Sequence, residues 1–357
     1  MKVYSTSECA ACYFRTAADY PSKKSLLQIT ERCNLHCKHC FVSSVSSGQN
    51  MDLDLILTKV IPEFVKNNIS KVTLTGGEPF VYPHLFEVVE ALRKSEISVC
   101  ICTNASLVTS DFVNRIKRLG EIHFNVSLDG FSNVSHGKFR GNDSVGLFTH
   151  ILNNIKMLGS ENMLNGILVT PNIYASIEEY KDICQFAKGN NAKYVLFNPL
   201  SEFGRGEETV SLSYTEHQML DLRKAVESYS GSKFETVFIR FPNSNSIPLN
   251  KCPAGDIIYI FTNGDIAYCP YMVFAAKNSS SIYDYQDFVM GNIFSSSFDW
   301  NKDVNNYRFP IMFDKVCAEC VNRECKKGCY ASKIALGKHL EECDEKLCPL
   351  INVTNTN

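Results

Sequence analysis

The chain has 357 residues, of which 45% are hydrophobic and 21% charged, and its formal net charge is −2. This composition is ordinary for a globular protein, and it lacks both the run of about 20 apolar residues that a membrane helix needs and a basic stripe for nucleic acid. The first residues lack the pattern of a secretory signal, so we expect a soluble cytoplasmic protein without a membrane or nucleic-acid partner.

The first two hundred residues alternate between short β-branched runs and segments with apolar residues at helical spacing. Strands are predicted at 25–30, 71–74, 98–103, 123–128, 166–170 and 194–198, and helices at 53–67, 83–94, 110–119, 146–158 and 177–188. This regular succession predicts a parallel sheet covered by helices. The expected fold class is therefore α/β, a partial (β/α)6 barrel of the TIM type.

The alternation fades after about residue 210, where one more helix is predicted at 214–228. Proline, asparagine and serine residues cluster at 241–250, and the sequence beyond is rich in cysteine and turn residues. The predicted domains follow from these changes. They are an N-terminal extension (1–24), the barrel (25–210), a bridging region (211–250), a small cysteine-rich domain (251–350) and a tail (351–357).

The 16 cysteines are the unusual feature of the composition. In a reducing compartment, metal or redox ligation explains so many cysteines better than disulfides do. Three lie between Cys33 and Cys40 and eight between Cys252 and Cys348, which indicates two metal-binding regions. The others are Cys9 and Cys12, which have no evident partner, and Cys100, Cys102 and Cys184, which are expected to be small core residues.

The polar and glycine motifs of the barrel follow its predicted strands. In β/α barrels the chemistry lies in the loops at the carboxyl ends of the strands, so these motifs should meet on one face. They are Cys33 to Cys40, Thr75 to Pro79, Thr103 with Asn104, Ser127 to Gly130, and Asn198.

The first of these loops has the spacing Cys-x3-Cys-x2-Cys, which is short enough to place three thiolates around one metal group. A 4Fe-4S cluster takes four cysteines when fully ligated, so three ligands leave one iron open for a small molecule. A zinc site with His36 or His39 as the fourth ligand is the alternative.

This cysteine spacing after the first strand, followed by Gly76-Gly77-Glu78-Pro79 after the second, resembles the radical SAM superfamily. The resemblance implies that Cys33, Cys37 and Cys40 hold a 4Fe-4S cluster whose open iron binds S-adenosylmethionine (SAM). It also implies reductive cleavage of SAM to a 5′-deoxyadenosyl radical. The two glycines would leave backbone room for the amino acid end of SAM, and the glutamate would approach its ammonium.

Further segments look like the parts of peptide-modifying family members that contact SAM. This match lies in two segments, Ser127 to Gly130 and Lys138 to Gly141. Arg140, expected in a loop, would donate two hydrogen bonds from its guanidinium to the SAM carboxylate. Phe203-Gly204-Arg205-Gly206 resembles a turn of the same group. The expected SAM contacts are Gly76, Gly77, Glu78, Pro79, Thr103, Asn104, Ser127, Asp129, Arg140, Asn172 and Asn198.

The C-terminal cysteines resemble a SPASM domain, which binds auxiliary 4Fe-4S clusters in enzymes that mature peptides, quinone cofactors and sulfatases. The match is a Cys…Gly-x4-Cys hairpin and a four-cysteine run whose middle spacing is x4 where x5 is usual. Two auxiliary clusters are implied, and two zinc sites are the alternative. The implied ligands are Cys252, Cys269 and Cys329 for the first cluster and Cys317, Cys320, Cys325 and Cys348 for the second, with Cys343 unassigned.

Together the two resemblances imply an enzyme that modifies a ribosomally synthesised peptide, by an oxidative intramolecular thioether or carbon-carbon cross-link. A formylglycine-forming sulfatase maturase is an alternative, although Pro270 follows Cys269 where those enzymes commonly have an aspartate. A radical SAM oxidoreductase acting on a quinone or tetrapyrrole and a non-catalytic iron-sulfur or zinc regulatory protein are the others. The expected partners are the precursor peptide, a flavodoxin- or ferredoxin-type electron donor and a separate leader-binding protein.

Overall fold

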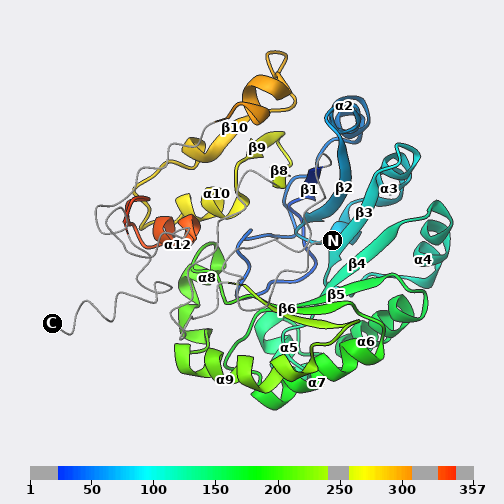
Figure 1. Cartoon of the computed structure of the whole chain (residues 1–357), viewed down its shortest axis with the longest axis vertical. Coiled ribbons are helices and arrows are strands. Elements are labelled where there is room, and N and C mark those ends of the chain that lie inside the picture. The colour runs from blue at the N-terminus through cyan, green and yellow to red at the C-terminus, as the bar shows by residue number, and fades with distance from the viewer. Residues whose placement is uncertain (1–22, 240–256, 308–328, 343–357) are drawn as a thin grey trace.

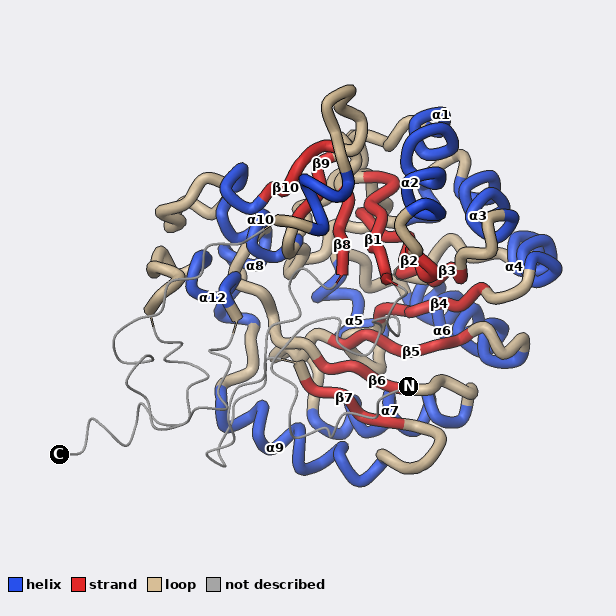
Figure 2. Tube along the Cα trace, turned by 45° about the horizontal axis from the view of Figure 1, so that its top comes forward, coloured by secondary structure: helices blue, strands red, loops and turns tan. Residues whose placement is uncertain are grey.

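The computed structural model describes residues 23–239, 257–307 and 329–342. Its centre is one sheet of described strands in the order β10-β9-β8-β1-β2-β3-β4-β5-β6-β7 (Figures 1 and 2). The strands are β1 (Lys23–Thr30), β2 (Ile69–Gly76), β3 (Ser98–Thr103), β4 (Ile122–Ser127), β5 (Leu164–Val169), β6 (Tyr194–Phe197), β7 (Glu235–Phe238), β8 (Ile257–Ile260), β9 (Asp265–Ala267) and β10 (Val289–Asn292).

Strands β1 to β7 run parallel, and β8 pairs in parallel with the other side of β1. Leu26 lies opposite Thr73, and Thr73 lies opposite Cys100 on the next strand. Because side chains alternate between the two faces of a strand, residues at one level of adjacent strands share a face. The strands fan round a centre and the helices lie outside them (Figure 1).

The outer helices connect the strands and begin at recognisable caps. Ser176 and Thr215 form capping boxes with Glu179 and Gln218, and these pairs fix the first residues of α7 and α9. The connecting helices are α1 (Leu53–Leu55), a π-helical turn (Ile56–Val60), α2 (Ile61–Lys66), α3 (Leu85–Lys94), α4 (Ser110–Ile116), α5 (Asn133–Arg140), α6 (Val145–Ser160), α7 (Ile177–Gly189), α8 (Arg205–Glu208) and α9 (Glu216–Val226).

The main hydrophobic core lies between the outer face of the sheet and these helices. Leu27 and Ile29 of β1 and Ile101 of β3 are fully buried in it with Val89 of α3 and Ile155 of α6. The alternate residues of the same strands face the centre, and many of those are polar. The inner face of the sheet is therefore suited to a binding site rather than to a dry core.

The C-terminal described segments extend the sheet and add a second core. The β8–β9 hairpin turns at Gly264, whose φ of +88° favours glycine. Helices α10 (Pro270–Ala276) and α12 (Tyr330–Ala335) pack on each other, and Met272 and Ile334 are buried between them and the hairpin. This region lies beside β1 (Figure 1).

The predicted fold class is confirmed, and each predicted strand and helix of the barrel is present with ends shifted by a few residues. The sequence analysis missed β7, which lies inside the predicted bridging region, because four residues are too few for a clear alternation. It also missed α5, whose polar face and internal Gly137 hide the helical periodicity. Because β8 pairs directly with β1, the described strands of the predicted C-terminal domain, β8, β9 and β10, extend the barrel sheet.

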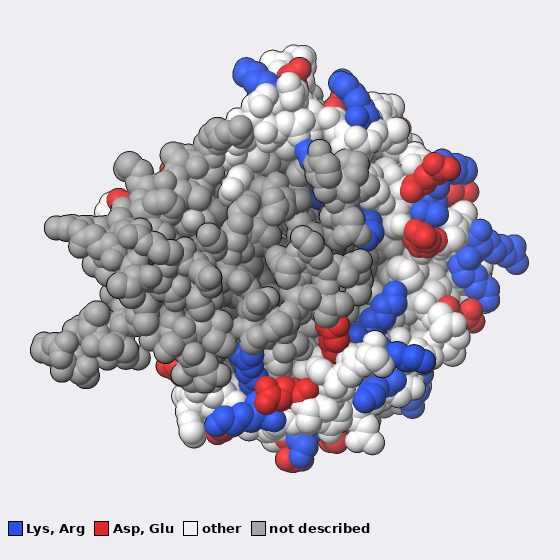
Figure 3. Space-filling view, viewed as in Figure 1, with Lys and Arg blue, Asp and Glu red and all other residues white. Residues whose placement is uncertain are grey.

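Charged side chains of both signs are mixed over the outer helices on the face shown in Figure 3. The ammonium of Lys94 lies 2.9 Å from the carboxylate of Glu90, and that of Lys181 lies 2.9 Å from Glu178. Such exposed pairs contribute about 0–1 kcal/mol each to stability. Among the described helices, none is long and apolar enough to cross a membrane.

Candidate functional site

A cavity of about 240 Å³ opens at the carboxyl ends of the parallel strands and reaches down along their inner face. Its wall contains Cys33, Cys37 and Cys40. It also contains every expected SAM contact except Pro79 and Asn172. The structure therefore brings the cysteine loop together with the motifs that follow β2, β3, β4 and β6.

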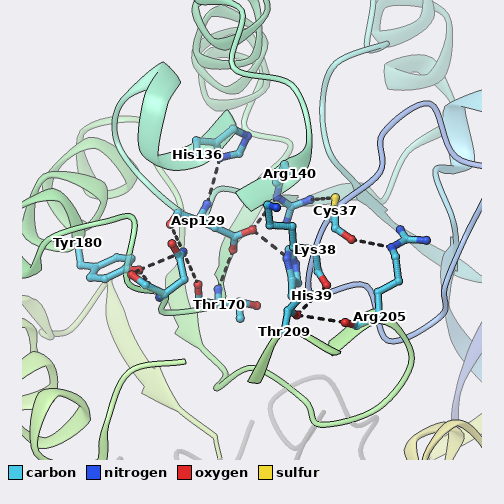
Figure 4. A network of polar contacts seen from close by, with 11 residues as sticks. Cys37, Lys38, His39, Asp129, His136, Arg140, Thr170, Tyr180, Arg205 and Thr209 are labelled. Atoms are coloured by element: carbon cyan, nitrogen blue, oxygen red, sulfur yellow. Dashed lines mark hydrogen bonds and ion pairs between the residues drawn. The ribbon is translucent and has the colours of Figure 1, made fainter. Parts of the chain in front are cut away.

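The cysteine loop is held in place from two sides (Figure 4). On one side the guanidinium of Arg205 donates to the carbonyl oxygens of Cys37 and Ser44, both at 2.8 Å, and the Thr209 hydroxyl donates to the carbonyl of Lys38 at 3.0 Å. On the other side the N–H of Lys38 donates to the carbonyl of Phe139 at 2.9 Å. These bonds fix the backbone that carries the three thiols.

Gly76 and Gly77 pack directly on the backbone that leads from β1 into the cysteine loop. The N–H of Gly77 donates to the carbonyl of Thr30 at 2.9 Å. A Cβ atom on Gly76 would lie 2.0 Å from the Thr30 oxygen, and one on Gly77 would lie 2.2 Å from the Arg32 oxygen. The Cβ atoms would thus collide with the chain itself, whereas the sequence analysis expected the collision to be with SAM.

This contact predicts a large effect for Gly77→Ala. We expect the substitution to separate the two loops, to lower the free energy of unfolding by at least about 2 kcal/mol and to weaken SAM binding. Gly189→Ala, at the end of α7, is the matched control because a Cβ there meets nothing within 4 Å. That control should be neutral or stabilising by about 0.4–1 kcal/mol. Urea unfolding and equilibrium dialysis with SAM measure both; equal stability of the two variants would contradict this account.

Glu78 is fully buried and ties the loop after β2 to the end of β3. Its carboxylate accepts hydrogen bonds from the Thr103 hydroxyl and the Asn104 N–H, both at 2.7 Å, and from the Phe80 N–H at 3.1 Å. Burial raises the pKa of Glu78, and these donors oppose that rise. The observed bonds make it a positioning residue, and its approach to the SAM ammonium stays a prediction.

Asp129 is the centre of a second buried network (Figure 4). One oxygen lies 2.6 Å from Nε of Arg140 and 3.6 Å from Nε2 of His39, and the other accepts from the Thr170 N–H at 2.7 Å. The His136 ring accepts the Asp129 N–H at 3.2 Å. Burial alone would raise the pKa of Asp129, but the positive charge of Arg140 and the neighbouring imidazoles hold it below its ordinary value.

The two imidazoles in this network are neutral near pH 7. Burial and the positive charge of Arg140 together lower the pKa of His39 to about 4 and that of His136 to about 3, although the carboxylate of Asp129 opposes both effects. The His39 ring stacks on Phe139 with the ring centres 4.1 Å apart. His39 therefore completes the packing of the cysteine loop as an uncharged side chain.

Arg140 is the last residue of helix α5 and is buried, which corrects its expected place in a loop. Its guanidinium pairs with Asp129 and its Nη1 lies 4.0 Å from Sγ of Cys37. Asn172 is also buried, and its amide donates to the Asp129 carbonyl at 2.9 Å, behind the cavity wall. Both residues support the cavity, and direct contacts with SAM stay predictions.

The donor set around the cysteine loop fits an iron-sulfur cluster. Burial raises the pKa of the Cys37 thiol to about 12, so an additional positive group is needed to hold it as a thiolate, and a metal cluster provides one. In the described part of the chain, no three Cys, His, Asp or Glu side chains converge closely enough to bind a single metal ion. Thiols that line a cavity without converging on one point suit a larger group.

The far wall of the cavity belongs to the C-terminal region. Tyr271, in the first turn of α10, lines the cavity, and its ring centre lies 5.0 Å from that of Phe41, which follows the cysteine loop. The amide of Asn198 donates to the Tyr271 hydroxyl at 3.5 Å. Cys269 and Cys329 directly precede α10 and α12, the two helices that pack together.

Only these two of the predicted auxiliary ligands can be placed. The positions outside the described residues are Cys252, Cys317, Cys320, Cys325, Cys343 and Cys348, together with Cys9 and Cys12. Cys184 is buried in the main core, as predicted. Cys102 lines the cavity, so its predicted place in the core is wrong: it lies on the inward-facing side of β3.

Sequence reasoning assigned no role to several cavity residues. Arg205 was noted only as part of a glycine-arginine turn, and Lys24, Thr73, Asn125 and Tyr194 were not singled out although all four line the cavity. A signal was present for two of these residues, because Thr73 and Asn125 are polar residues inside strands and have an apolar residue on each side. Polar residues at alternate strand positions indicate a second, non-core face.

Comparison with known proteins supports this picture. Residues 27–187 match the Radical SAM superfamily. The chain is similar to mycofactocin maturase MftC of Mycobacterium tuberculosis H37Rv, with 24% identity over 329 residues that cover 89% of this chain and 80% of MftC. It is also similar to the antilisterial bacteriocin subtilosin biosynthesis protein AlbA of Bacillus subtilis, with 23% identity over 322 residues that cover 87% of this chain and 68% of AlbA.

Solved structures share the fold. Streptococcus suis SuiB bound to S-adenosylmethionine superposes with a TM-score of 0.71 at 17% identity, covering 92% of this chain and 77% of SuiB. SuiB bound to the precursor peptide SuiA gives 0.71 at 18% identity, covering 92% and 76%. The family match and the cysteine spacing identify residues 27–187 as a radical SAM domain, and over most of its length the chain is similar to a peptide maturase and to a bacteriocin biosynthesis protein.

Proposed function

We propose that this enzyme uses SAM to modify a ribosomally synthesised peptide by an oxidative intramolecular cross-link, either a thioether or a carbon-carbon bond. The main support is that the wall of one cavity contains both the cysteine loop of the barrel and Tyr271 of α10, the helix that directly follows Cys269. A site between these two regions joins the family's radical chemistry to the part of the chain expected to hold auxiliary clusters.

The residues of the site have three roles: some would hold the iron-sulfur cluster, some fix the walls of the cavity, and others would surround SAM. Cys33, Cys37 and Cys40 would hold a 4Fe-4S cluster, which when bound supplies the electron that cleaves SAM. Arg205 fixes the carbonyl of Cys37, and the Asp129–Arg140 pair fixes the facing wall. The cavity-lining expected contacts, among them Gly77, Thr103, Ser127 and Asn198, would surround SAM.

The peptide substrate is supported by the relatives. MftC is a maturase of mycofactocin, AlbA takes part in bacteriocin biosynthesis, and SuiB has been seen with a precursor peptide. At 24% identity or below these names do not transfer a particular bond or sequence. They favour a precursor peptide over a quinone or tetrapyrrole, with a cytoplasmic flavodoxin- or ferredoxin-type electron donor and a separate leader-binding protein as further partners.

The proposed oxidative outcome requires an electron acceptor. Removal of one hydrogen atom leaves a carbon radical on the peptide, and closing a new bond with loss of a second hydrogen, as a proton, also releases one electron. That electron needs an acceptor near the cavity. Cys269 and Cys329, together with predicted ligands outside the described residues, would house an iron-sulfur cluster suited to this role.

The experiment is mass spectrometry of a cognate peptide co-expressed with the enzyme, with a peptide gene beside this reading frame as the first candidate. We expect a loss of two hydrogens per modification and a ring that resists fragmentation. The control is the same peptide co-expressed with the Cys33→Ala variant, which should be unchanged. An unchanged mass, or incorporation of a single deuterium in heavy water, would instead indicate an epimer and refute the oxidative assignment.

A further inference from the structure

Lys24, on β1, has an ammonium that the chemistry above does not use. The residue is 5% exposed and lines the lower part of the cavity, well below the cysteine loop. Within the described ranges, no hydrogen bond or ion pair to this ammonium is found. A buried cation without a partner loses the solvation of water and gains nothing in return, so such an arrangement points to a missing ligand.

The neighbours of Lys24 are polar but supply no negative carboxylate. The hydroxyl of Thr73, on the adjacent strand and the same face, is buried without a hydrogen-bond partner. Cys102 and Asn125, which lie opposite each other on β3 and β4, line the cavity above this level, which is its floor. The groups whose charge acts on Lys24 are Cys100, Cys102 and Lys71.

The charge state supports an anionic ligand. Burial lowers the pKa of Lys24 to about 8, which leaves most of the molecules protonated at pH 7. An ammonium with a hydroxyl donor beside it matches the two oxygens of a carboxylate. An apolar or cationic group in the same place would leave both donors unpaired.

The position separates this floor from the expected SAM site. Thr30 lies six residues beyond Lys24 on β1, so their backbones are roughly 20 Å apart along the strand at 3.3 Å per residue. The expected SAM contacts follow the carboxyl ends of the strands, near Thr30 and Gly76. A ligand on the floor would therefore lie below the expected SAM site, in the same cavity.

We propose that Lys24 and Thr73 form a subsite that binds a carboxylate of the peptide substrate, from an Asp or Glu side chain or from the C-terminus. That the ligand belongs to a peptide rests on the proposed function. That the ligand is a carboxylate rests on the cavity residues alone. Lys24 is then a specificity-determining residue that fixes how deep the peptide enters.

The first test needs no peptide. Equilibrium dialysis of radiolabelled glutarate is carried out with the reconstituted full-length enzyme and saturating SAM, with the diamide glutaramide as the uncharged competitor. Wild type should bind glutarate and ignore glutaramide, and Lys24→Met should bind it at least about tenfold more weakly. Lys23→Met is the matched control, because that side chain is exposed and donates to Asn305 at 2.6 Å. Absence of glutarate binding, or binding that survives Lys24→Met, overturns the proposal.

The second test uses the peptide found by mass spectrometry. Lys24→Met should raise its KM about 10- to 100-fold while the dissociation constant for SAM stays within about twofold, and Lys24→Arg should recover part of the loss. Amidating the peptide C-terminus, or changing each Asp to Asn and Glu to Gln, identifies which carboxylate is bound. An unchanged KM, or a weakened affinity for SAM, refutes the subsite. Glutarate binding without any peptide modification refutes the proposed function and leaves the subsite standing.

Discussion

Replacing Cys33, Cys37 and Cys40 together with alanine is expected to abolish the release of 5′-deoxyadenosine. The three thiols line one cavity, and burial raises the pKa of Cys33 and that of Cys37. Bare thiolates are therefore disfavoured at these positions, and a metal group is needed to hold them. Without these ligands no cluster can form beside the SAM site. Product quantification by liquid chromatography, in the presence of a strong reductant, measures the effect.

The iron content of the same variant tests the separate auxiliary clusters. Wild type reconstituted without oxygen should contain about twelve iron atoms if all three clusters are of the four-iron type, and the triple variant about eight. Cys184→Ala is the matched control, since Cys184 is buried in the main core away from the cavity wall. It should keep both the iron and the activity. Continued SAM cleavage by the triple variant would refute the assignment, and stoichiometric zinc in place of iron would favour structural zinc sites.

Arg140→Met is expected to destabilise the protein by about 3–5 kcal/mol, the second large effect. The substitution leaves the carboxylate of Asp129 buried without its guanidinium, with the Thr170 N–H at 2.7 Å and the His39 ring at 3.6 Å still in place. Removing both charges with Asp129→Asn and Arg140→Met should recover part of that loss, because the cost comes mainly from the unpaired charge. Thermal unfolding of the reconstituted protein measures all three variants.

A surface pair provides the control for this buried one. Lys181→Met breaks the exposed contact with Glu178 at 2.9 Å and should change stability by less than about 1 kcal/mol. The Arg140 variant should also lose iron more readily, because Arg140 lies beside Cys37 and follows Phe139, which holds Lys38. If Arg140→Met were as mild as Lys181→Met, the pair would not stabilise the cavity wall.

Local patterns in the sequence were sufficient to locate most strands of the barrel and the face on which its polar and glycine motifs meet. The alternation in β3, for example, gives both ends of Ser98–Thr103 as predicted, because side-chain periodicity depends only on neighbouring residues. The motifs after β1, β2 and β3 meet because parallel strands end at one edge. β7 was missed because so short a strand is specified by its pairing with β6 rather than by its own pattern.

The roles of individual residues depended on contacts between distant segments. The atom that excludes a Cβ at Gly76 belongs to Thr30, and the partner of Arg140 is Asp129 at the end of another element. Arg205 contacts the cysteine loop only because the chain returns to it after β6. Such contacts are set by the register and curvature of the sheet, which a linear pattern does not contain.

The sequence by itself determined most strands and helices of the barrel and the spacing of three cysteines on one short loop, because each depends on neighbouring residues. Only the tertiary structure decided which polar side chains share a cavity and which are paired. It placed a buried ion pair behind the cysteine loop and left Lys24 facing the cavity floor. The physical reason is that the burial and the partners of a side chain depend on residues from several strands. These strands are far apart in the sequence and come together only when the chain folds.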